Sequence, residues 1–415
     1  MPFAIHLLGL AVFAQGTSEF MLSGLVSGIA GDLGVSIPAV GHLTSAFAVG
    51  MVVGAPLMAI LSRRFSRRGA LLAFLVTFLA VHVTGALTTS FAVLLATRVV
   101  GALANAGFLA VALITAADLA GPHAKGRATS ALLGGVTVAC VAGVPAGALL
   151  GEVWGWRSAF WAVALLSLPA LAAIAWAVPA GPPDSVGPDA AGPDDARPSV
   201  LGELRALRSP RLRLTLLLGA LVNGATFCTF TYLEPLVTRV TGLGSDWVPV
   251  VLALFGIGSF AGVSLAGRVA DVRPLPLLVG GSCALLGGWA LFAVTAAHPA
   301  ATVVLVLVLG ALSFGVGATL ISQVLYAASE APTLAGGFAT AAFNVGGALG
   351  PWCGGLVLSA GLGHRAPVWV SALLVGVALA VGGTALARRR RATAPAPSVP
   401  SFRGSGRCGG APPRP

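Results

Sequence analysis

Twelve long apolar segments constrain this chain more than any other feature of its sequence, because each is about 20 residues or longer. A helix of that length crosses a hydrocarbon core ~30 Å thick, whereas a membrane barrel would use alternating strands of about 10 residues. With 57% hydrophobic and 9% charged residues among 415, the chain is too apolar for a soluble globule. We therefore predict an all-α integral membrane protein. The expected transmembrane helices lie near residues 4–27, 39–61, 69–88, 91–117, 129–150, 158–178, 212–237, 248–267, 276–297, 301–326, 336–360 and 367–387.

The distribution of Lys and Arg predicts how these helices are oriented. If the N-terminus lies in the cytoplasm, 20 of the 24 Lys and Arg residues fall in cytoplasmic segments. Only Arg157, Arg239 and Arg365 fall outside, and Arg98 lies within a helix. By the positive-inside rule, we expect a multi-pass protein of the cytoplasmic membrane with both termini in the cytoplasm. The net charge of +11 therefore reflects topology, and nucleic acid is not an expected partner.

A polar stretch divides the chain into two halves. Residues 179–211 are rich in Pro, Gly, Asp and Arg, which predicts a hydrophilic cytoplasmic linker. It separates a six-helix N-terminal half, 1–178, from a six-helix C-terminal half, 212–387. The Pro- and Gly-rich tail, 388–415, is expected to be disordered.

The two halves also share an internal repeat. A shift of 208 residues brings Gln15 to Asn223 and Phe47 to Phe255. Duplicated six-helix halves with a substrate site between them are a transporter architecture. The repeat does not reproduce Glu19 or Arg98, so the ionisable chemistry is expected in the N-terminal half.

The first apolar segment contains a carboxylate, Glu19. In a helix, Gln15, Glu19 and Ser23 share one stripe, since residues four apart lie above one another. A charge near the bilayer centre costs roughly 2.5 to 3.5 kcal/mol even on the insertion scale, so an intramembrane acid indicates a functional site. The stripe is therefore expected to face protein or water.

The fourth segment carries Arg98 and, two turns further on, Asn105 on the same face. Glu19 and Arg98 both lie roughly 10 to 12 Å below the outer surface, at 1.5 Å per residue. One interpretation is a structural ion pair that keeps both charges out of lipid. The other is that Glu19 exchanges protons while Arg98 tunes its affinity for them.

The fifth and seventh segments contain further candidates. Gly143 and Gly147 lie four residues apart, with Pro145 between them, which indicates close helix packing and a bend. In the seventh segment Asn223 is a candidate ligand contact, while Glu234 lies near the outer end and is expected to be solvated.

Other classes of function find little support in the sequence. There is no nucleophile and base constellation, phosphate loop or metal-ligand spacing, so we expect no enzyme activity, no cofactor and no metal. A non-transporting membrane receptor would need a signalling domain, for which the linker and tail leave little room.

Several motifs resemble the major facilitator superfamily over residues 1 to about 390. They are Arg98 within RVVGALANAG, the fifth-segment motif GVPAG (Gly143 to Gly147), GTSEFMLSGL and GWRSAFW. The last two are similar to twelve-span drug:proton antiporters, and LTSAFAVGMVVGAPL and LGALVNGATFCTFTYL are most similar to actinobacterial chloramphenicol exporters. The resemblance implies a major facilitator fold and alternating-access export of chloramphenicol or related phenicols, driven by protons.

The polar residues within the spans and the resemblance together indicate roles for individual residues, in a protein that we expect to act as a monomer in the lipid bilayer. The expected proton-coupling residues are Glu19 and Arg98. The expected contacts to a small amphipathic drug are Gln15, Ser23, Asn105 and Asn223. The expected antiporter motif is Gly143, Pro145 and Gly147.

One part of the sequence departs from the superfamily pattern. In the loop after the second segment, Arg63 stands where the superfamily has an acid, whereas the equivalent second-half loop retains Asp271. We expect a cytoplasmic gate that includes Arg63, Arg67, Asp271 and Arg273. Exporters of sugars or of nucleosides and purines share the GTSEF-like stretch, and they remain the alternative transporter hypothesis.

Overall fold

The computed structural model describes residues 3–62, 65–120, 132, 134–178, 204–269, 274–328 and 335–393. Across these ranges the regular secondary structure is helical, and 12 helices are long and apolar enough to cross a membrane. The prediction of an all-α, twelve-span membrane protein is thus confirmed. In the first half the long helices are α1 (Phe3–Phe20), α3 (Ile37–Ser62), α4 (Arg67–Leu87), α5 (Phe91–Ala120), a fifth span at Gly134–Trp154 that ends in α7 (Val144–Trp154), and α8 (Arg157–Ala177).

The second half repeats this pattern. Its spans are α10 (Pro210–Thr231), α12 (Trp247–Val269), α13 (Pro274–Thr295), α14 (Pro299–Ala327), α15 (Ala335–Ser359) and α16 (Ala366–Thr393). Short elements interrupt or join the spans: a 3-10 helix at Met21–Gly24, α2 (Val26–Leu33), a π-helical turn at Ala139–Gly143, a 3-10 helix at Leu204–Arg208, α11 (Leu233–Leu236) and a π-helical turn at Val237–Thr241.

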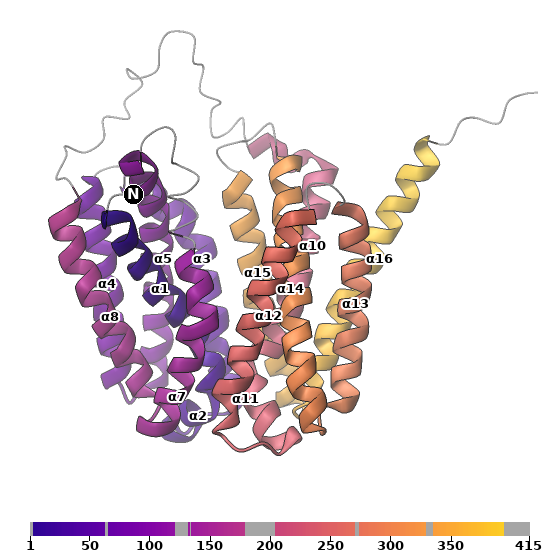
Figure 1. The fold of residues 1–415 in the computed structure, drawn as a ribbon, viewed down its shortest axis with the longest axis horizontal. Coiled ribbons are helices and arrows are strands. Elements are labelled where there is room, and N and C mark those ends of the chain that lie inside the picture. The colour runs from indigo at the N-terminus through magenta and orange to yellow at the C-terminus, as the bar shows by residue number, and fades with distance from the viewer. Residues whose placement is uncertain are drawn as a thin grey trace, which may run out of the picture.

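The two halves stand side by side as separate bundles of near-parallel helices (Figure 1). The chain begins at the upper end of the first bundle, which we call the terminal face because α16 also ends there. At the lower end, α2 of the first bundle approaches α11 of the second (Figure 1). We call this end the opposite face.

Each half has its own apolar core. The core of the first half includes Leu75, Phe78 and Phe108, and that of the second includes Trp289 and Phe292, all essentially inaccessible to solvent. The fifth span crosses this division, because Val144 and Ala148 of α7 pack into the core of the second half. It therefore joins the two bundles.

Two predicted boundaries were wrong. The linker was expected to continue to residue 211, but residues 204–208 form a 3-10 helix whose Ala206 packs with Leu212, and α10 already begins at Pro210. Proline suits the first turn of a helix, where its missing N–H is not needed. The tail was expected to be disordered from residue 388, but α16 continues to Thr393 because Ala and Arg favour helix. Residues 394–415 lie outside the described ranges.

Trp156 and Arg157 of the GWRSAFW motif connect several helix ends at the opposite face of the first half. Arg157 forms an ion pair with Asp32 at the end of α2, and it also donates a 2.9 Å hydrogen bond to the carbonyl of Thr88. The indole N–H of Trp156 donates to the same Asp32 carboxylate at 3.1 Å. These two donors hold the pKa of Asp32 below its usual value. The motif therefore connects α2, α8 and the end of α4.

Candidate functional site

The guanidinium of Arg98 is buried inside the first half. Its Nη1 donates to the hydroxyl of Ser18 and its Nη2 to the carbonyl of Ser18, both at 2.9 Å. The ring of Phe47 lies under the guanidinium, with its centroid 4.4 Å from Cζ. The Nε atom is buried without a partner. Arg98 thus joins α5 to α1 and α3 at one point.

A fourth helix contributes to the same site through His82 on α4. Its Nε2 lies 2.6 Å from the Ser18 hydroxyl, and its Nδ1 lies 2.7 Å from the carbonyl of Phe78. Ser18, His82 and Arg98 are each at most 2% exposed. We call these three residues the Arg98 cluster.

Glu19 follows Ser18 and is only partly buried. Its carboxylate forms no ion pair within 4.0 Å, as far as the described ranges extend. Electrostatic interactions nevertheless link Glu19 with Arg98 and with Cys140. Glu19 and Arg98 therefore lie near each other, but Arg98 bonds to the neighbouring Ser18.

The structure places three of the four predicted drug contacts in the first half and one in the second. Gln15, Ser23 and Asn105 are buried in the first half, and both polar atoms of the Gln15 amide have no partner. Asn223 donates a 2.6 Å hydrogen bond to the carbonyl of Phe343, which links α10 to α15 within the second half. None of the four lines the pocket that lies between the halves.

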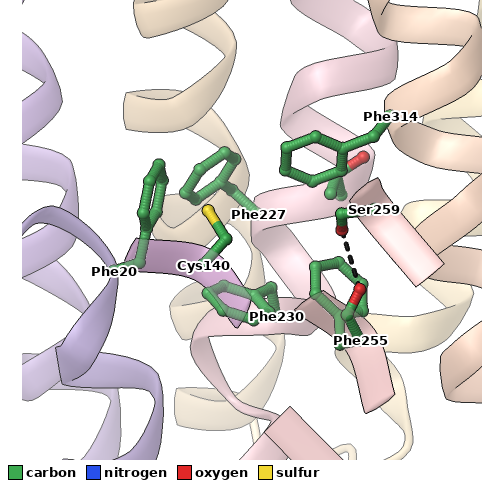
Figure 2. A pocket seen from close by; sticks show the side chains of 8 residues that line it. Phe20, Cys140, Phe227, Phe230, Phe255, Ser259 and Phe314 are labelled. Carbon is green, nitrogen blue, oxygen red and sulfur yellow. Dashed lines mark hydrogen bonds between the residues drawn. The ribbon is translucent and has the colours of Figure 1, made fainter. Parts of the chain in front are cut away.

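That pocket is lined mainly by aromatic rings (Figure 2). The first half contributes Phe20 and Cys140, whose sulfur lies between Phe20 and Phe227 in Figure 2. Its cavity volume is only about 10 Å³, far below the roughly 300–1,000 Å³ typical of ligand sites, so in this conformation the rings pack against one another and must separate to admit a drug. The lining residues are Phe20, Cys140, Thr226, Phe227, Phe230, Phe255, Ser259 and Phe314. We call this the aromatic pocket.

The two hydroxyl groups that line the aromatic pocket have no free proton to donate to a ligand. Thr226 donates to the carbonyl of Val222 at 3.0 Å, and Ser259 donates to that of Phe255 at 2.8 Å, so both hydroxyl protons are used within their own helices. Phe255 stacks on Phe230, with ring centroids 4.7 Å apart. The pocket is therefore suited to a neutral molecule with an aromatic ring.

The fifth span brings the pocket next to the proton candidate. Its π-helical turn at Ala139–Gly143 contains Cys140, and π-helical turns are common at functional sites. Gly143 packs so tightly against Thr17 of α1 that an added Cβ would collide with the threonine hydroxyl. Gly256 of the second half lies equally close to the carbonyl of Cys140. The close packing expected of the fifth-segment glycines is thus present at Gly143, and a Cβ added at Gly147 would lie 3.3 Å from the Cβ of Met21.

Polar contacts hold the halves together toward the opposite face. The backbone N–H of Ser27 donates to Glu234 at 2.8 Å, and Ser245 bonds to Glu152 at 2.6 Å. Tyr232 donates to the carbonyl of Pro351 at 2.8 Å while its hydroxyl fills the space beside Gly41.

The expectation that Glu234 is solvated was wrong. The side chain is 8% exposed, and burial raises its pKa despite the hydrogen bond from Ser27. The break between α10 and α11 at Tyr232 carries the carboxylate into the contact between the halves instead of into solvent.

The predicted gate lies mostly beyond the described ranges. Arg63, Asp271 and Arg273 fall outside them, whereas Arg67 is the first residue of α4. The gate stays a prediction.

Sequence reasoning missed the partners of Arg98 and most of the pocket. Ser18 belongs to the GTSEF stretch, and His82 is a titratable residue within an apolar span, so both could have been noticed. Phe227, Phe230 and Phe255 look like ordinary apolar residues in a membrane helix, and only their positions in space distinguish them.

The sequence matches a known protein family over most of its length. The Major Facilitator Superfamily is matched over residues 8–336. This chain belongs to the Major Facilitator Superfamily. It is therefore a membrane transporter rather than an enzyme.

Two relatives within the superfamily carry informative names. A chloramphenicol resistance protein of Streptomyces lividans is 54% identical over 381 residues, which cover 92% of this chain and 95% of that protein. A chloramphenicol efflux pump of Mycobacterium tuberculosis (strain CDC 1551 / Oshkosh) is 31% identical over 383 residues, 90% of each chain. The superfamily fold also matches the crystal structure of a bacterial homologue of the human lysosomal transporter Spinster, in an inward-facing and unoccupied conformation. The TM-score is 0.75 at 16% identity, covering 91% of this chain and 95% of that one.

Proposed function

We propose that this transporter exports chloramphenicol or related phenicols in exchange for protons. The observation that carries the proposal is the position of Glu19, an acid in a membrane span that directly follows Ser18, the residue to which Arg98 is hydrogen-bonded. The relatives named for chloramphenicol resistance and efflux support the drug class. A neutral, amphipathic drug suits an aromatic pocket with few polar groups.

Coupling follows if drug and proton favour opposite states of Glu19. A proton that enters from outside neutralises Glu19, and the drug binds in the pocket when Glu19 is charged. Linkage between the two bindings then lets the proton gradient drive the drug outward. Gln15 does not line the aromatic pocket in this conformation, and in our proposal its buried, unpartnered amide contacts the drug after the transporter changes state. The antiporter motif of Gly143, Pro145 and Gly147 keeps the fifth span against α1.

The orientation of the protein is part of the proposal. Both termini lie in the cytoplasm of a monomeric protein in the cytoplasmic membrane, as the bias of Lys and Arg favours. The opposite face is then external, and the contacts of Ser27 with Glu234 and of Ser245 with Glu152 close it. Arg63, Arg67, Asp271 and Arg273 form the gate on the cytoplasmic side.

The test is chloramphenicol accumulation in cells that express the protein, with and without a protonophore. Low accumulation that rises when the gradient collapses is expected for the wild type, and Glu19→Gln should abolish uphill export while the protein still reaches the membrane. Asp246→Asn, which removes an exposed carboxylate that does not line the pocket, is the matched control and should export normally. Undiminished export by Glu19→Gln would refute the role of Glu19. Accumulation equal to that of control cells would refute chloramphenicol as substrate and favour sugar or nucleoside export.

A further inference from the structure

The hydrogen bonds of the Arg98 cluster run in one direction only. The carbonyl of Phe78 can only accept, so Nδ1 of His82 carries the proton, and Nε2 of the neutral ring accepts from the Ser18 hydroxyl. A protonated ring would place a second positive charge beside Arg98 in a site closed to solvent, at a large cost. Because the only proton of the Ser18 hydroxyl is used, its oxygen faces Arg98 as an acceptor.

Arg98 is thereby held by residue 18 and not by residue 19. Both terminal nitrogens bond to Ser18, one to the side chain and one to the backbone, and the Phe47 ring covers one face of the guanidinium. A guanidinium presents its donors in a fixed fork, so a group held at two points has little freedom to turn toward another acceptor. Its charge acts on Glu19 without direct pairing.

We propose that Ser18 and His82 are positioning residues of the proton site, which keep Arg98 beside Glu19 and prevent an ion pair between them. This inference rests on the proposed role of Glu19. A direct pair away from solvent would hold Glu19 in its charged form, since an opposite charge within about 4–6 Å strongly favours that form. Glu19 can take up a proton in each cycle because the cluster keeps Arg98 occupied.

Few other groups in the described ranges compete for this role. The titratable groups that interact with Glu19 are Arg98 on α5 and Cys140 on the π-helical turn, and His82 on α4 is connected to it through Ser18. From α3 the cluster receives only the Phe47 ring. The pH dependence of the site therefore reports on Arg98 and on what holds it.

The experiment measures binding of radiolabelled chloramphenicol to the purified full-length protein in lipid nanodiscs as a function of pH. In the wild type, binding should fall as the pH falls and Glu19 is protonated. Ser18→Ala removes a hydrogen bond to Arg98, and His82→Phe removes the acceptor that orients the Ser18 hydroxyl. Arg98 can then pair with Glu19 and favour its charged form, so the pH of half-maximal binding should move about one unit toward acid. His82→Phe retains a ring between Phe78 and Phe160, and it remains informative if Ser18→Ala does not fold.

Two further variants separate positioning from packing. His82→Gln restores an acceptor for the Ser18 hydroxyl and should recover the wild-type midpoint. Ser167→Ala removes another buried serine hydroxyl of the first half, one that bonds only to Val163 of its own helix, and should not move the midpoint. A wild-type midpoint in folded Ser18→Ala and His82→Phe, even with lowered stability, would overturn the positioning role. If chloramphenicol binding to the wild type did not depend on pH, or if Glu19→Gln showed the same pH dependence as the wild type, the proposed function would be overturned instead.

Discussion

The two halves are built on one repeat but contain opposite chemistry at equivalent positions. In the first half Phe47 lies under Arg98, which bonds to Ser18. In the second half the equivalent Phe255 stacks on Phe230, and Val306 takes the place of Arg98.

Other pairs of equivalent positions differ in the same way. Glu19 corresponds to Phe227 and His82 to Ala290, so a charged and hydrogen-bonded interior in one half becomes an aromatic wall in the other. A common backbone arrangement can therefore serve two tasks, because a few side chains at one depth decide what each half can bind. In our proposal the proton site lies in the first half, whereas the second half supplies most of the aromatic wall that contacts the drug.

The largest expected effect comes from replacing the charge of the first half. Arg98→Ala should lower proton-driven chloramphenicol export at least about tenfold, equivalent to about 1.4 kcal/mol, because Glu19 loses the positive charge that acts on it. Drug accumulation in energised cells measures this. Val306→Ala, at the equivalent position of the second half, should keep most of the export. Similar losses in both variants would break the comparison between the halves.

Next in size is the exchange of one aromatic ring. Phe255→Ala removes a ring that lines the aromatic pocket and stacks on Phe230, so the affinity for chloramphenicol should fall roughly tenfold, or about 1.4 kcal/mol, with no change in its pH midpoint. Equilibrium binding at several pH values measures both quantities. The reverse pattern is expected for Phe47→Ala, which uncovers Arg98 and leaves the pocket intact. A pH shift in Phe255→Ala would contradict the division of tasks.

A smaller effect concerns the contact between the halves at Glu234. Burial raises its pKa in the folded protein, so the folded state binds this proton more tightly than the unfolded state does. Between the unfolded and the folded pKa, the free energy of unfolding therefore falls as pH rises, by at most about 1.4 kcal/mol per pH unit for one proton.

Glu234→Gln should remove this contribution, which makes the melting temperature less dependent on pH across that window. Thermal unfolding of the purified protein between mildly acidic and neutral pH measures the slope. Asp246→Asn, at an exposed position, should retain the wild-type slope. An unchanged slope in Glu234→Gln would mean that this carboxylate does not sense the contact between the halves.

The smallest expected effect concerns the side-chain amides of Gln15 and Asn223, which occupy equivalent positions in the internal repeat. Asn223 is bonded to the carbonyl of Phe343, whereas the equivalent Gln15 has no partner. Asn223→Ala should therefore lower stability by only about 0.6 kcal/mol, the average for such bonds between membrane helices, and leave drug affinity unchanged. Gln15→Ala should weaken drug binding without loss of stability. Unfolding and binding measurements on the same two samples test both statements.

The sequence predicted the twelve helices, because the length and composition of an apolar segment are enough to indicate a membrane span. It could not predict which neighbour Arg98 chooses. Ser18 and Glu19 point in directions about 100° apart on α1, and a helix that is apolar on all sides shows no periodicity that fixes its rotation. Lipid and protein core accept the same side chains, so Phe227 and Phe255 gave no sign that they face a pocket. The error at Glu234 arose because a break at Tyr232 redirected the chain.

The hydrogen bonds of the Arg98 cluster also have a consequence for biosynthesis. They lie entirely within residues 18–98, whereas the aromatic pocket is incomplete until Phe314 has been synthesised, 216 residues later. At about 5–20 residues per second, the ribosome needs roughly 10 to 40 s to cover that distance. During this time the newly inserted first half already carries a buried cation in the bilayer. Because its partners are all encoded before residue 98, the nascent chain can satisfy that charge without waiting for the second half.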